Sequence, residues 1–136
     1  MVRFLMVGVL LAALAACTSG EDMQVAIQGV ADFRRQMEQQ EFAQVYAGGS
    51  EELRKSASEA DMARILGGLR TRLGKVQNAE RNGWHVNWHT SGTFVTLGFK
   101  TRFENGAGAE QFVFRVVDGK ASLVSYNINS PALLPK

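Results

Sequence analysis

The sequence has little cysteine and no large excess of positive or negative charge. Cys17 is the single cysteine among 136 residues, so a disulfide within the chain is excluded. The 15 Lys and Arg side chains nearly balance the 13 Asp and Glu side chains and are interspersed with them, for a formal net charge of +2. Nucleic-acid-binding proteins need a basic surface, so we expect no nucleic acid as a partner.

Catalytic motifs are missing too. The sequence contains no G-x-S-x-G, H-E-x-x-H, P-loop or G-x-G-x-x-G motif. His85 and His89 are the only histidines. Positions four apart on a strand are separated by roughly 13 Å, whereas zinc ligands each lie about 2 Å from the ion. We therefore expect no metal site and no cofactor, and no residue can be assigned as catalytic.

Long apolar runs are absent apart from one at the N-terminus. The basic start Met1-Val2-Arg3 is followed by an apolar run from Phe4 to Ala16, which is typical of a secretory signal peptide. A membrane-spanning helix needs roughly 20 apolar residues, and polar residues begin at Thr18. Residues 1–16 are therefore predicted to direct export and to be removed.

The end of this run, Leu14-Ala15-Ala16-Cys17, resembles the lipobox of bacterial lipoproteins. In those proteins the cysteine carries a diacylglycerol, and its new amine is usually acylated, for example with palmitate. The resemblance implies that Cys17 is lipidated and, because Thr18 rather than Asp follows it, that the protein lies at the periplasmic face of the outer membrane. Two or more acyl chains give a stable anchor, at about 0.8 kcal/mol per buried methylene. The alternative is an ordinary signal peptide followed by a coincidental cysteine.

After the signal, we expect a lipidated tether over residues 17–21 and one domain over 22–136, because about 120 residues suffice for a single core. Apolar spacing predicts a first helix over 22–39 and a short helix ending before Gly48-Gly49, and we expect a polar helical stretch over 50–55. Ser58 begins a capping-box pattern and Gly74 is placed as the stop of a further helix, whose arginines are expected off its apolar face.

From residue 75 onward the apolar period changes to two, which predicts strands. The first covers 76–89, bent at Asn82-Gly83, with Trp84, Val86 and Trp88 on one face. Later strands alternate through Val95–Phe103 and Phe112–Val116, and Asp118-Gly119 predicts a tight hairpin before a last strand over 121–129. Glu110, beside a turn, is expected to be a turn or rim residue.

Helices followed by antiparallel strands predict an α+β fold, with N-terminal helices packed on a bent four-stranded antiparallel meander. The sequence also resembles a family of uncharacterised bacterial envelope domains with a cystatin-like or nuclear-transport-factor-like fold. The resemblance covers most of the mature chain, and it implies the fold but no activity. Its matching segments are Arg72-Leu73-Gly74-Lys75-Val76, Phe94-Val95-Thr96-Leu97, Glu110-Gln111-Phe112-Val113-Phe114, Asp118-Gly119-Lys120 and Ser125-Tyr126-Asn127-Ile128.

Two kinds of candidate site follow from the strand pattern. Most aromatic side chains are expected in the core, but Phe94, Val113 and Val117 fall on the opposite faces of their strands, where they could form an interaction face. Polar side chains expected to reach a cavity are His85, Asn87 and Tyr126. The leading hypothesis is a membrane-anchored binding or interaction module of the cell envelope, whose partner is an envelope protein or a second copy. Its alternatives are a cavity enzyme of hydrolase or isomerase type and a purely structural envelope protein.

Overall fold

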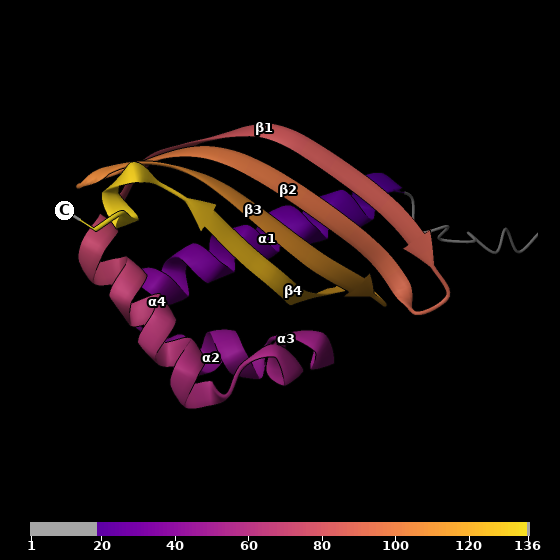
Figure 1. The fold of residues 1–136 in the computed structure, drawn as a ribbon. Helices are drawn as coiled ribbons and strands as arrows, with labels where there is room; N and C mark the ends of the chain where they lie inside the picture. Colours follow the sequence, from indigo (N-terminus) through magenta and orange to yellow (C-terminus); the bar gives the residue numbers. More distant parts are fainter. Residues whose placement is uncertain (1–18, 136) are drawn as a thin grey trace, which may run out of the picture.

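The computed structural model describes residues 19–135 (Figure 1). The predicted signal peptide and Cys17 lie outside these residues. The chain forms helices and then strands, and no helix of the described part is long and apolar enough to cross a membrane. The elements are α1 (Ser19–Glu38), α2 (Phe42–Ala47), α3 (Glu51–Ser56), α4 (Glu59–Leu73), β1 (Val76–His89), β2 (Gly92–Phe103), β3 (Gly106–Val117), β4 (Lys120–Asn129) and the short 3-10 helix η1 (Pro131–Leu133).

Helix α1 crosses the concave face of the sheet and contacts all four strands (Figure 1). Its buried side chains, Ala26, Val30 and Phe33, follow the predicted helical spacing. Helix α1 begins at Ser19, three residues before the predicted start at residue 22. Acidic side chains in the first turn, including Glu21, favour this extension because they face the positive end of the helix dipole.

The helical region contains four helices. The stretch after Gly49 is a helix of its own, α3. The hydroxyl oxygen of Ser50 accepts a hydrogen bond from Leu53 N–H and starts α3. Ser58 caps α4 in the same way by accepting from Asp61 N–H, as the sequence predicted. Helix α4 ends at Gly74, whose φ of 76° suits glycine.

The sheet is an antiparallel meander in the order β1-β2-β3-β4, which confirms the predicted α+β fold. The predicted bend in β1 is a register irregularity between Arg81 and Gly83. Asp118 and Gly119 both have positive φ, 50° and 73°, as a two-residue hairpin turn requires. The strands curve strongly around α1 (Figure 1).

The core lies between α1 and the inward face of the central strands. Alternate residues of β2 and β3 point inward and are buried, as the period of two predicted. Ring contacts add directional packing, such as the edge-to-face pair of Phe33 and Phe112 with centroids 5.1 Å apart. The buried apolar residues of the sheet are Val95, Leu97, Phe103, Phe112, Phe114, Val116 and Leu123.

Helix α4 has a different environment from α1, because it packs mainly on α2 and η1. Its apolar face is consequently incompletely covered. Leu66 and Leu73 are buried, whereas Ile65 remains 46% exposed. The incomplete cover leaves a hollow between α4 and the sheet.

Candidate binding groove and its buried carboxylate

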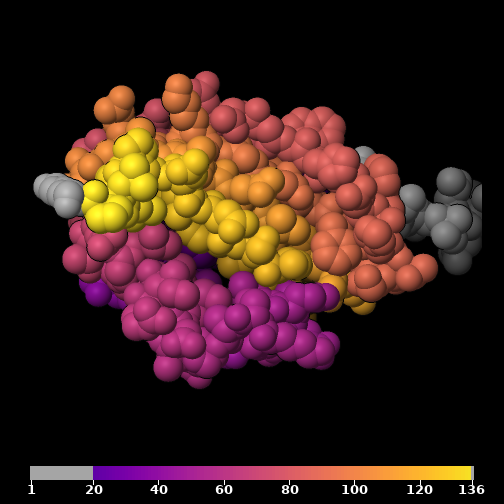
Figure 2. Space-filling model, in the orientation of Figure 1, coloured from indigo at the N-terminus to yellow at the C-terminus, as the bar shows by residue number. Residues whose placement is uncertain are grey.

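Two adjoining hollows separate α4 from the sheet. The first has a volume of about 380 Å³ and the second about 350 Å³, and Phe33, Leu69 and Tyr126 line both. Figure 2 shows this hollowed region between the C-terminal strand, in yellow, and the magenta helices. We call the two hollows together the α4 groove. The first volume lies in the range of small-molecule sites, roughly 300–1,000 Å³.

The first hollow combines an apolar wall with an excess of basic groups. Its apolar part comes from α1, α4 and strand ends, and its ionisable part contains four basic and two acidic side chains. Such a lining suits a ligand with an apolar body and an anionic group. The residues that line it are Phe33, Arg34, Arg35, Met37, Glu38, Leu69, Arg70, Leu73, Gly74, Lys75, Val76, Phe103, Glu110 and Tyr126.

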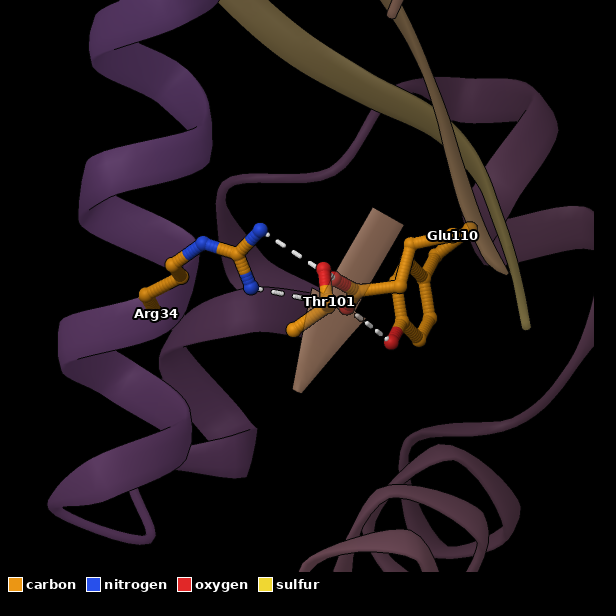
Figure 3. Close-up of polar contacts among 4 residues, drawn as sticks. Arg34, Thr101 and Glu110 are labelled. Carbon is orange, nitrogen blue, oxygen red and sulfur yellow. Dashed lines mark hydrogen bonds and ion pairs between the residues drawn. The ribbon is translucent and has the colours of Figure 1, made fainter. Parts of the chain in front are cut away.

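Glu110 forms the polar centre of the first hollow (Figure 3). Its side chain, on β3, is only 1% exposed. Both terminal nitrogens of Arg34 on α1 donate to it, at 3.1 and 3.5 Å. The Tyr126 hydroxyl donates to Oε2 at 2.6 Å, and the Thr101 hydroxyl donates to Oε1. Every carboxylate oxygen of Glu110 therefore accepts hydrogen bonds from within the protein.

The surroundings of Arg34 and Tyr126 determine their roles beside Glu110. The Arg34 guanidinium lies over the rings of Phe99 and Phe112, at 5.2 and 5.6 Å from their centroids, which compensates part of its desolvation. Burial, together with the charge of Glu110, raises the pKa of the Tyr126 hydroxyl far above its usual range. Tyr126 is consequently a hydrogen-bond donor and not a base in this cluster.

Arg70 is the basic group of the groove with the fewest partners. Its side chain is 20% exposed and approaches Glu38 at 3.9 Å, too far for a hydrogen bond. Its Nε is buried and has no hydrogen-bond partner among the described residues. Lys75 takes the closer position beside Glu38, at 3.2 Å. Because its side chain is 20% exposed, lines the hollow and makes no hydrogen bond to Glu38, the Arg70 guanidinium is available to an anion.

The structure separates the three residues predicted to face a cavity. Tyr126 lines both hollows of the groove. His85 and Asn87 line neither, and both are exposed. The expectation for these two was wrong, because they alternate with Trp84 and Val86 along β1 and so point to the convex face of the sheet.

The predicted interaction face is interrupted by its neighbours. Phe94 and Val113 are half-buried on the convex side, while Val117 is 45% exposed. The Arg115 guanidinium covers the ring of Phe94 at 4.9 Å, and the His89 ring packs against it edge to face at 5.2 Å. The exposed apolar area at these three positions is therefore smaller than the sequence suggested.

Trp84 and Trp88 differ from the expectation that most aromatic residues would be core. They share one face of β1, as predicted, and lie opposite Leu97 and Thr93 on the inward face of the sheet. Yet they are 66% and 67% exposed. The reason is that β1 is an edge strand, so that only one neighbouring strand and a small part of α1 pack beside it.

Comparison with known proteins assigns no function to this arrangement. No protein-family model matches the sequence, and no curated protein is detectably similar to it. Over residues 19–135, no group of three or more His, Cys, Asp and Glu side chains is placed to hold a metal ion. The site is therefore interpreted from its own geometry.

Sequence reasoning missed Glu110, Arg34 and Arg70, although each left a signal. Glu110 is in phase with Phe112, so the period of two already placed it inward, where it is buried and not at a rim. Arg34 lies four residues after Val30, and Arg70 four after Leu66, so both adjoin apolar helix faces. The prediction that Arg70 lies off the apolar face was wrong.

Proposed function

We propose that this protein is a lipid-anchored binding protein of the bacterial cell envelope, and that its α4 groove holds an amphipathic anion. The anchor is supported by the lipobox-like sequence ending at Cys17, the only cysteine of the chain. The ligand class is supported by the groove itself. The observation that carries it is the Arg70 guanidinium, which lines an apolar hollow of about 380 Å³ and lies too far from Glu38, at 3.9 Å, for a hydrogen bond.

The predicted ligand has a hydrocarbon body and one carboxylate or phosphate group. The hydrocarbon would contact Leu69, Phe33 and their apolar neighbours, which line both hollows. The anionic group would accept from Arg70 and lie near Lys75 at the end of α4. Two adjoining hollows give an elongated site, which suits a chain better than a compact polar molecule.

Binding agrees better with this geometry than acid–base catalysis does. A general base needs a free lone pair within reach of the substrate proton. Arg34, Thr101 and Tyr126 already donate to both oxygens of Glu110. The two histidines, the other side chains suited to proton transfer near neutral pH, are exposed on β1 and line neither hollow.

A photoreactive long-chain carboxylate tests the proposal on the full-length lipoprotein in vesicles. We expect crosslinks on α4 and β4, mapped by mass analysis of peptides, and little labelling by the primary amide of the same chain. Arg70→Met should reduce the affinity for the carboxylate, measured from the concentration dependence of labelling, by about 10- to 150-fold, because one charge-assisted hydrogen bond contributes about 1.5–3 kcal/mol.

Arg102→Met is the matched control, because Arg102 is exposed and does not line the groove. Equal labelling by the acid and the amide would contradict the proposal that the ligand is an anion. Crosslinks spread over the whole surface would contradict the proposal that the groove is the binding site. Incorporation of labelled fatty acid into the native protein tests the anchor separately, and a leader still attached at residue 1 would contradict it.

A further inference from the structure

The only two tryptophans of the chain, Trp84 and Trp88, are exposed on the same face of one strand. Both lie on the second half of β1, and half-buried Val86 lies between them on that face. Exposing two indole rings to water is unfavourable, since each aromatic side chain can bury 150–250 Å². Their arrangement suggests a surface that contacts something other than water.

The segment of the sequence that carries these tryptophans contains no charged residue. From Asn82 to Phe99, across the end of β1, its turn and most of β2, the sequence contains no Asp, Glu, Lys or Arg. In the chain as a whole 21% of residues are charged, so an uncharged hairpin of this length is unusual for it. We call residues 82–99 the tryptophan hairpin. A charge-free hairpin avoids the cost of bringing ions to an apolar medium.

The tryptophan hairpin lies at the end of the molecule where helix α1 begins. Figure 1 shows the first turns of α1 beside the second half of β1, and α1 contacts this strand. Cys17 precedes Ser19, the first described residue, by two positions. Two residues span at most about 7 Å. A lipid attached to Cys17 would therefore bring a membrane surface close to this end of the sheet.

We propose that Trp84 and Trp88 insert into the headgroup region of the membrane and form a second contact beside the lipid anchor. This inference rests on the anchor in the proposed function. Indole rings prefer the membrane interface because their body is apolar and their N–H still reaches polar groups. Val86 adds apolar area between them, and the polar side chains of His85 and Asn87 stay on the convex face.

The second contact gives the domain a fixed orientation on the membrane. A lipid anchor alone restrains one point, so the domain could rotate about it. With the tryptophan hairpin on the surface, the sheet end near Lys75 and Val76 points away from the lipid, because these residues lie at the opposite end of β1. The basic end of the α4 groove would then open away from the membrane.

Tryptophan fluorescence tests this contact directly, because only these two residues contribute to it. The full-length lipoprotein is placed in vesicles of phosphatidylethanolamine and phosphatidylglycerol, with or without brominated acyl chains. We expect emission at shorter wavelength than for water-exposed indole, and strong quenching by the brominated lipid. Trp84→Phe and Trp88→Phe leave one reporter each, and both remaining tryptophans should be quenched.

The matched control uses an equally exposed position at the other end of the sheet. Leu134 is 68% exposed and lies near the C-terminus, far from the start of α1 (Figure 1). In a protein that carries Trp84→Phe and Trp88→Phe, a Leu134→Trp substitution should report a water-exposed ring that brominated lipid does not quench. Unchanged circular dichroism shows that each variant is folded.

Several outcomes would overturn the proposal. Unquenched tryptophans in a protein that sediments with the vesicles and carries the acyl label would show that the anchor exists but the second contact does not. Short-wavelength emission without lipid quenching would indicate burial against protein and would equally contradict it. If the acyl label is absent, the anchor fails, and quenching by added vesicles would then support membrane contact by the tryptophans alone.

Discussion

Glu110 occupies an inward position of β3 that periodicity otherwise gives to apolar side chains such as Phe112. The carboxylate is tolerated there because it receives donors from three other elements, α1, β2 and β4. Its ion pair with Arg34 fixes α1 on the sheet. A buried pair of this kind gives little net stability against an apolar replacement, but losing one partner is costly.

This asymmetry predicts the behaviour of two variants. Arg34→Met should lower the free energy of unfolding by about 3–5 kcal/mol, since it leaves a buried carboxylate without its cation. The double variant Arg34→Met with Glu110→Leu should regain part of that loss, because an apolar pair suits the rings of Phe99 and Phe112. The recovery is incomplete because the Thr101 and Tyr126 hydroxyls lose their acceptor. Denaturant unfolding of both proteins measures the difference, and two equally unstable variants would contradict the interpretation.

The raised pKa of Tyr126 leads us to expect that the folded protein loses stability at alkaline pH. The Tyr126 pKa is raised in the folded protein, so folding keeps the proton on a group that the unfolded chain releases near its ordinary pKa of about 10. The contribution is complete below about pH 10 and declines as the pH rises further, because the unfolded state then binds fewer protons. Tyr126→Phe should flatten the decline, which thermal unfolding at increasing pH would reveal. A parallel decline in both proteins would exclude Tyr126 as its cause.

At the scale of elements, Gly29 allows α1 to pack closely against β3. An added Cβ at Gly29 would lie 2.7 Å from the buried ring of Phe114. Helix and strand therefore approach more closely here than any larger residue permits. The apolar stripe of α1 predicts which side faces the sheet, but the distance of approach depends on the partner side chain.

Two glycine-to-alanine substitutions distinguish packing from helix propensity. Gly29→Ala should destabilise the protein by about 1–3 kcal/mol, because the added methyl group would lie only 2.7 Å from the buried Phe114 ring, which would have to shift. Gly68→Ala, in α4, should stabilise it by about 0.5–1 kcal/mol, since nothing lies within 4 Å of the added methyl group. Thermal unfolding compares the two, and a stabilising effect at position 29 would contradict the close contact.

At the scale of the whole molecule, the helices cover the concave face of the sheet unequally. Helix α1 seals the centre of the concave face, whereas α4 leaves a groove and β1 leaves two tryptophans exposed. The opposite ends of the sheet thereby gain different properties. One end is basic and hollow, and the other, beside the start of α1, carries the tryptophan hairpin, a segment without charged residues.

The open groove makes a stability prediction for neighbouring positions of α4. Ile65→Lys should change the free energy of unfolding by less than about 1 kcal/mol, because the side chain is 46% exposed at the edge of the groove. Leu66→Ala should cost about 2–5 kcal/mol, because Leu66 is buried. Denaturant unfolding gives both values. A severe loss at position 65 would mean that α4 packs closely against the sheet and that the groove is closed.

Much of the fold could be predicted from local patterns. The helical spacing over α1, the serine cap of α4, the irregularity near Asn82 and the hairpin at Asp118-Gly119 all appear in the structure where the sequence placed them. Each depends on neighbours within a few residues, through backbone conformation or side-chain periodicity. The candidate site could not be found in this way, since its residues come from positions as far apart as Arg34 and Glu110.

By itself the sequence determined the order of helices and strands and the alternation of side chains along them, because these properties belong to short stretches of chain. The signal peptide and the lipidation of Cys17 stay predictions. Only the tertiary structure decided which inward faces are covered. It buried Glu110 beneath α1, left Arg70 beside a hollow and exposed Trp84 and Trp88 at the sheet edge. Burial depends on what packs opposite a residue, and the sequence pattern of one element does not contain its partner.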